Sequence, residues 1–136
     1  MRDTSRKPPM RRLAAIFLPL SPLFLMAGAQ PAAAQGESFY VQQYNSASRE
    51  LARNFSELES LRSRMRVEQD FTVGCGLLSS VIYRLEEMQR ILKNMLGYLD
   101  QLGDVDAYNS SVTDYNNLIE DLNTSRDDYA RLCADR

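Results

Sequence analysis

The sequence predicts an all-α protein, an antiparallel up-down-up bundle of three helices with the form of a coiled-coil-like rod. Three observations predict this class. Four uninterrupted heptads occupy residues 77–102, apolar residues recur at helical spacing on both sides of them, and only short glycine-containing segments separate the three patterns. A signal peptide, residues 1–34, is expected to precede the helical domain, residues 35–136.

The central helix, expected at about residues 76–102, carries the clearest pattern. When Leu78 is counted as position a, every a and d site over four heptads is apolar, and the b and c sites are polar. Further apolar residues at e and g sites widen this face: Leu77, Ile82, Ile91, Leu96 and Tyr98. A single partner helix would leave part of so wide a face in water. The pattern therefore predicts that this helix lies between two neighbours.

The first helix is expected at about residues 37–70. Its apolar residues recur every seven positions: Tyr44, Leu51, Leu58 and Met65. Residues 71–76 contain Gly74 and Gly76 and are expected to connect the first helix to the central one. So short a connection requires an antiparallel hairpin, and a turn near Val73 predicts that residues whose numbers add to about 146 face each other.

The third helix is expected at about residues 104–134, after Gly103 as a left-handed terminating residue and with Asp104 or Asp106 as its cap. Its a and d sites should face the central helix: Val105, Tyr108, Val112, Tyr115, Ile119, Leu122, Arg126, Tyr129 and Cys133. The tyrosine rings are expected to pack in the core with their hydroxyl groups towards water or a partner. Arg126, the one charged residue at these sites, should reach water or pair with an acid.

Two groups of charged residues have both an ordinary and a functional interpretation. Arg62, Arg64 and Arg66 lie in the last turns of the first helix, where they are expected to be solvated and to complement the helix dipole; an anion site is the alternative. An acidic stripe follows the b and c sites of the third helix: Asp106, Asp114, Glu120, Asp121, Asp127 and Asp128. This stripe is expected to be a solvated face, because it lacks the compact loop of a calcium site. Contact with a basic partner or with divalent cations is the alternative.

Residues 1–34 have the features of a secretory signal. Basic residues precede an apolar run at 13–29: Arg2, Arg6, Lys7, Arg11 and Arg12. Cleavage is expected after Ala34, with Ala29 as the alternative. An uncleaved membrane anchor is disfavoured, because the apolar run contains Pro19 and Pro22 and falls short of the ~20 residues that span a bilayer. The sequence therefore predicts export to the periplasm or the extracellular space.

The composition of the remaining chain excludes several classes of function. Without residues 1–34 the chain holds 11 basic and 17 acidic residues, a net charge of about −6, so nucleic acid and anionic membranes are poor partners. Membrane contact is expected only through an uncleaved leader. The chain has no histidine, which removes the commonest general base and zinc ligand. The adjacent carboxylate pairs, Glu86 with Glu87 and Asp127 with Asp128, diverge by about 100° on a helix. We therefore expect no enzyme, no cofactor and no metal site.

The two cysteines are expected to form a disulfide. An exported chain with two cysteines usually joins them. With the second turn centred on Asp104, Cys75 and Cys133 are equally distant from it along the chain, so two antiparallel helices bring them side by side. The alternative is a reactive thiol at Cys75, near the start of a helix.

The predicted function is that of a non-enzymatic structural or adaptor protein, which docks to other proteins of the cell envelope or of a secretion-type assembly. A second copy of the chain is one such partner. The alternative is a periplasmic holdase-like chaperone or a binder of a small apolar ligand. With the turn near Val73, Phe39, Tyr40 and Val41 should overhang the second turn and form a docking anchor. A frayed N-terminus is the competing interpretation of these three residues.

Overall fold

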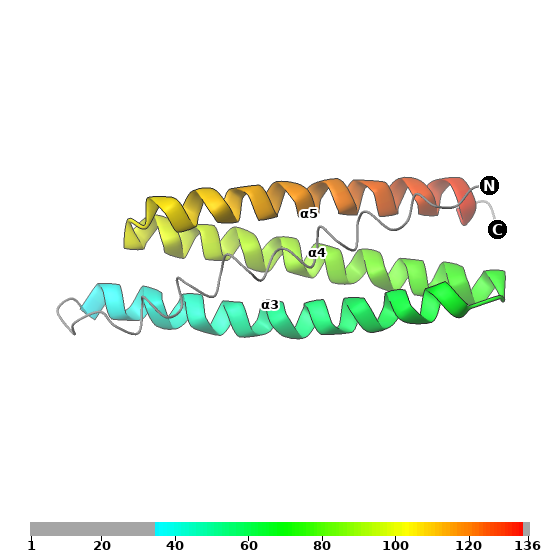
Figure 1. The fold of residues 1–136 in the computed structure, drawn as a ribbon, viewed down its shortest axis with the longest axis horizontal. Helices are drawn as coiled ribbons and strands as arrows, with labels where there is room; N and C mark the ends of the chain where they lie inside the picture. The colour runs from blue at the N-terminus through cyan, green and yellow to red at the C-terminus, as the bar shows by residue number, and fades with distance from the viewer. Residues whose placement is uncertain (1–34, 135–136) are drawn as a thin grey trace.

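The computed structural model describes residues 35–134, and this part of the chain is three helices without a strand. They are α3 (Gln35–Val67), α4 (Phe71–Leu102) and α5 (Val105–Leu132). Figure 1 shows them side by side along the long axis of the molecule, running up, down and up. The predicted all-α class and three-helix bundle are confirmed. The predicted signal peptide and its cleavage sites lie outside the described residues.

Helix α4 is the central element, and it packs against both α3 and α5. Its face is buried along the whole length of the bundle: Leu77, Leu78, Val81, Leu85, Met88, Ile91, Leu92, Met95 and Leu99. From Val81 to Leu99, these side chains form one core cluster with Tyr44, Leu51 and Leu58 of α3 and with Leu118 and Leu122 of α5. The prediction that a wide apolar face implies two neighbours is confirmed. None of the helices in residues 35–134 has the length and apolar character needed to cross a membrane.

The first turn lies earlier in the chain than predicted. Helix α3 ends at Val67 and α4 begins at Phe71, so residues 71–76 are helical and only three residues connect the helices. Asp70 caps α4, because its Oδ1 accepts a hydrogen bond of 3.0 Å from the backbone N–H of Val73. Gly74 and Gly76 lie inside the first turns of α4. Capping by an aspartate thus determined where the helix starts, and the glycines did not.

The earlier turn changes the pairing of α3 with α4. Arg84 contacts Glu57 and Arg90 contacts Glu50, so facing residue numbers add to about 140 and not to the predicted 146. The difference is close to one heptad. A shift of one heptad returns the same apolar positions to the same face, so the apolar pattern fits both registers equally well. The predicted register was therefore wrong, although it too places apolar residues opposite each other, such as Leu58 with Met88 and Leu51 with Met95.

The second turn agrees with the prediction. Gly103 ends α4 in the left-handed region with φ of 72°, and Asp104 caps α5 by accepting a 3.0 Å hydrogen bond from the backbone N–H of Ala107. Because Cys75 and Cys133 are equally distant from this turn along the chain, they come to disulfide distance, with a Cα–Cα separation of 5.8 Å. The prediction that these two cysteines meet is confirmed, and their bond joins the far end of α4 to the end of α5.

Helix α5 is rotated relative to the prediction. Its buried residues include g and c sites of the predicted heptad: Ser111, Asp114, Leu118, Asp121, Leu122 and Ser125. Val105, a predicted seam residue, is 67% exposed. The reason is that α5 faces two helices. Tyr115 and Arg126 contact α4, whereas Asp121 contacts α3. The middle of the buried face of α5 therefore points between α3 and α4.

Candidate docking surfaces and a buried polar seam

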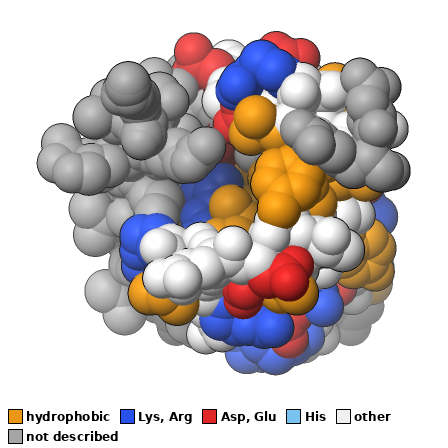
Figure 2. All heavy atoms as spheres, turned by 90° about the vertical axis from the view of Figure 1, so that its right-hand side faces the viewer, with side chains coloured by type: hydrophobic (Ala, Val, Ile, Leu, Met, Phe, Trp, Pro, Cys, Tyr) orange, Lys and Arg blue, Asp and Glu red, His pale blue; other side chains and the backbone are white. Residues whose placement is uncertain are grey.

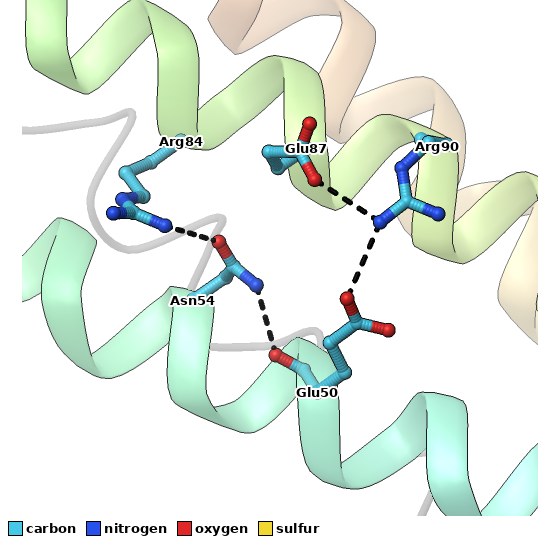
Figure 3. Close-up of polar contacts among 5 residues, drawn as sticks. All are labelled: Glu50, Asn54, Arg84, Glu87 and Arg90. Atoms are coloured by element: carbon cyan, nitrogen blue, oxygen red, sulfur yellow. Dashed lines mark hydrogen bonds and ion pairs between the residues drawn. The ribbon is translucent and has the colours of Figure 1, made fainter.

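The flank formed by α3 and α4 carries charges that pair within the chain. Figure 3 shows Arg90 between Glu50 and Glu87, at 3.2 and 3.0 Å, and Arg84 donating to Asn54 Oδ1 at 3.1 Å. Asn54 in turn donates to the backbone carbonyl of Glu50. Exposed pairs of this kind are each worth about 0.2–1 kcal/mol. Their main effect is to occupy charges that a partner could otherwise use.

The flank between α4 and α5 is joined by two polar contacts. Arg126 donates to Glu86 at 2.7 Å, which confirms that this charged seam residue pairs with an acid. Gln89 donates to the hydroxyl oxygen of Tyr115 at 3.3 Å, so this ring packs with its polar end partnered. The Glu86 carboxylate thus joins α4 to α5, a contact that the sequence pattern did not assign to it.

The contact between α3 and α5 contains a buried ion pair that the sequence analysis did not predict. The Arg62 guanidinium donates to both carboxylate oxygens of Asp121, at 3.2 and 3.3 Å, and the two side chains are 8% and 1% exposed. The prediction of a solvated arginine cluster is therefore wrong for Arg62, whereas Arg64 and Arg66 are exposed. Arg62 and Asp121 both lie on faces that the sequence pattern assigned to solvent. The pattern could not show which polar face of α3 meets which polar face of α5.

Buried polar atoms without a hydrogen-bond partner concentrate on the same two helices. They are Tyr44 Oη, Asn45 Oδ1 and an Nη of Arg62 on α3, and Ser111 Oγ and Asp114 Oδ2 on α5. Among the described residues no such atom belongs to α4. We call the line of residues Tyr44, Arg62, Ser111, Asp114 and Asp121 the polar seam. The two seams of α4 are apolar and well packed, so the polar seam is the least satisfied contact in the bundle.

Asp114 shows the energetic cost of this seam. The residue is 5% exposed, and burial raises the pKa of its carboxyl group from 3.8 to about 6. The prediction that the whole acidic stripe is a solvated face is thus wrong for Asp114 and Asp121, although Asp106, Glu120 and Asp127 are exposed. Burial, with smaller contributions from Asp104 and Asp114, also raises the pKa of the nearby Tyr44 hydroxyl. Both raised pKa values mean that burial disfavours a negative charge on Asp114 and on Tyr44.

Replacement of Asp114 by asparagine is expected to stabilise the protein near neutral pH. A folded-state pKa above the unfolded value means that folding disfavours the ionised form. The penalty is absent below about pH 4, grows as the pH rises towards 6, and is complete above it. Asp114→Asn should therefore raise the free energy of unfolding at pH 7.5 by up to about 3 kcal/mol. Urea unfolding at pH 4 and pH 7.5 measures this, and an equal effect at both values would contradict it.

The exposed apolar side chains gather at the two ends of the rod. In the described part of the chain the large ones are Phe39, Val67, Phe71, Val73, Tyr83 and Val105. Apart from Tyr83, they lie near the start of α3, at the turn between α3 and α4, or at the start of α5. Tyr83 lies on the flank in a groove of about 450 Å³, where the Arg84 guanidinium lies 5.2 Å from the centre of its ring. Single exposed apolar residues are common, but a grouping at the ends of a rod is typical of contact surfaces.

The first of these surfaces, which we call the aromatic end, consists of Phe39, Tyr40, Val41, Tyr98 and Val105. Phe39 is 52% exposed and packs edge-on against Tyr40, with ring centres 5.2 Å apart. The Tyr40 ring lies 6.5 Å from that of Tyr98 on α4, so Tyr40 has an intramolecular neighbour. The expectation that nothing in the chain faces these residues is thus wrong for Tyr40, as the shifted register of α3 and α4 requires. Docking through this end stays a prediction.

The second surface, which we call the turn end, consists of Val67, Phe71 and Val73. These residues are between 44% and 77% exposed. Figure 2 looks onto this end and shows apolar side chains gathered among basic and acidic ones. Beside them a groove of about 370 Å³ is lined by Phe71, Tyr129 and the cysteine pair. This surface was not predicted, because residues 71–76 were expected to be a connection and not part of a helix. Asp70, as a helix cap three residues before Val73, is the signal in the sequence that indicates it.

The described residues contain no group of three or more His, Cys, Asp or Glu that could hold a metal ion. Comparison of the chain with protein-family models, with curated proteins and with solved structures found no match.

Proposed function

We propose that this protein is an exported, non-enzymatic structural or adaptor protein, which docks to other proteins of the cell envelope or of a secretion-type assembly through the ends of its helical rod. The observation that carries the proposal is the position of the exposed apolar side chains. Phe39 and Val105 mark one end and Val67, Phe71 and Val73 mark the other. The flanks between them carry ion pairs that join neighbouring helices.

The cysteine pair supports both export and a rigid rod. Disulfides persist in oxidising compartments, which agrees with the signal peptide expected at residues 1–34. The bond would hold α4 and α5 together at the end furthest from their connecting turn. A rod clamped in this way keeps its two ends at a constant separation, and this property suits a spacer or adaptor.

The packing of the core favours an adaptor over a capsule for an apolar ligand. The central seam is filled by large side chains that are almost completely buried, among them Leu85, Met88, Leu92 and Met95. The grooves of about 450 and 370 Å³ are lined by surface residues such as Ser60 and Thr72 and do not enter this core. A small apolar ligand would have to displace core side chains to bind within the bundle.

Site-specific photo-crosslinking tests docking through the ends. A photoreactive phenylalanine analogue is placed at Phe39 or Val67, and at the exposed flank positions Ala52, Asn94 and Thr124 as controls. The full chain is expressed in the cells that make it and irradiated there. Partner adducts should form from one or both end positions, and the flank positions should give severalfold weaker adducts, because their surroundings are charged and hydrated.

The distribution of adducts decides between the functional classes. Adducts of similar strength and many different masses from all five positions would support the holdase-like alternative instead. A complete lack of adducts from both ends, with folded protein present in the irradiated cells, would exclude end-on docking.

A further inference from the structure

The two ends of the rod differ in charge. Around the aromatic end, residues 35–48 and 94–113 contain four acidic residues and no lysine or arginine: Glu37, Asp100, Asp104 and Asp106. The turn end carries exposed arginines, Arg64 and Arg66, as well as the acids Glu68 and Asp70. Among the described residues, the charged side chains of the aromatic end are therefore all acidic, whereas those of the turn end are mixed.

Three of these four acids are available to a partner. Asp104 is engaged as the cap of α5. No hydrogen bond or ion pair within the described residues engages the side chains of Glu37, Asp100 or Asp106, and Asp100 and Asp106 are exposed. By contrast, Glu50, Glu57 and Glu86 on the flanks are paired with arginines. The charges at the aromatic end are therefore not neutralised by the described part of the chain.

Apolar and acidic residues occupy the same end of the rod. Phe39 and Val105 are 52% and 67% exposed, and the Phe39, Tyr40 and Tyr98 rings form a contiguous aromatic group. An aromatic centre with a charged rim is the usual composition of a protein–protein contact. Because the charged residues at this end are all negative, the complementary surface is positive.

We propose that the aromatic end binds a basic protein surface, in which an apolar pocket takes Phe39 and a rim of lysine or arginine side chains pairs with Glu37, Asp100 and Asp106. This proposal rests on the proposed function and adds to it the chemistry of the partner. The same negative charge repels phosphate groups, so nucleic acid and anionic lipid do not fit this end. The partner is a different protein, since the turn end of a second copy combines its arginines with acids.

The test combines photo-crosslinking with removal of charge. The photoreactive analogue stays at position 39 of the full chain, and a triple variant adds Glu37→Gln, Asp100→Asn and Asp106→Asn. Asp104 is kept because it caps α5. The matched control removes three acids elsewhere, by Glu59→Gln, Glu68→Gln and Asp127→Asn, and so changes the net charge equally. Circular dichroism of each purified variant checks that the bundle is folded.

The expected result is a loss of adduct in the end variant only. Charged residues at the edge of an interface act mainly on the association rate and on its dependence on salt. The yield of adduct from the end variant should therefore fall roughly fivefold or more. The matched control variant should retain its adduct. Raising the ionic strength of the cell suspension should weaken the adduct that the unsubstituted acids support. Mass spectrometry should locate the crosslink beside lysine or arginine residues of the partner.

Other outcomes separate this proposal from the proposed function. An adduct at position 39 that persists in the end variant would overturn the basic partner while leaving end-on docking intact. An adduct with twice the mass of the chain would show that a second copy is the occupant, and would overturn the assignment to a different protein. Absence of any adduct at both ends would remove the proposed function itself.

Discussion

Replacing both Cys75 and Cys133 by serine is expected to lower the free energy of unfolding by about 4 kcal/mol. The bond closes a loop with a sequence separation of 58. In the chain-entropy model, loss of the bond raises the conformational entropy of the unfolded chain and so favours unfolding. The effect is large for a bundle of about 100 residues, whose total stability is on the order of 5–15 kcal/mol. Urea unfolding of the wild type and the double variant measures it.

The matched control for this prediction is the wild-type protein unfolded in the presence of a strong reductant. It should behave like the serine variant, because both lack the same covalent link. Thiol titration of denatured, non-reduced protein from its native compartment should find no free thiol. Two free thiols there would show that the bond does not form in the native compartment. Equal stability of the oxidised protein and the serine variant would show that the bond forms without stabilising the bundle.

Replacing Arg62 by methionine is expected to lower the free energy of unfolding by about 3–5 kcal/mol. The substitution keeps an apolar stem of similar length but removes the guanidinium that donates to Asp121, whose side chain is 1% exposed. A buried carboxylate deprived of its cation is costly because the protein interior solvates it poorly. Chemical unfolding near pH 7.5 measures the loss.

A double variant distinguishes the cost of an isolated charge from the value of the pair. Arg62→Met combined with Asp121→Leu should recover most of the stability, since apolar replacement of a buried pair is often neutral or stabilising. Arg64→Met, at an exposed position two residues away, should change the free energy of unfolding by less than about 0.5 kcal/mol. A small loss in Arg62→Met itself would show that the pair is hydrated in solution.

The helices and the second turn could be predicted from local pattern. Four apolar heptads define α4, and Gly103 followed by Asp104 gives both the end of one helix and the cap of the next. The pairing of Cys75 with Cys133 followed from their equal distance along the chain from this turn. Each of these inferences uses information that lies within a few residues or a simple count along the chain.

The register of α3 against α4 could not be obtained in the same way. A repeat of seven residues looks the same after a shift of seven, so apolar pairing alone accepts either register. The choice depended on Asp70, whose side chain caps α4 and moves the turn away from the glycines. One consequence reaches the candidate docking surface, because the Tyr40 ring then faces Tyr98 of α4.

The sequence by itself determined that this chain forms three amphipathic helices with α4 between the other two, because a wide apolar face must be covered on both sides. Only the tertiary structure decided which polar residues meet where α3 contacts α5. Arg62, Asp114 and Asp121 sit on faces that the pattern assigned to water, and they are buried because α5 rotates to contact two helices at once. The tertiary structure also placed Val67, Phe71 and Val73 together at the turn end. A contact between polar faces leaves no periodic signal, because water and a polar neighbour select the same residue types.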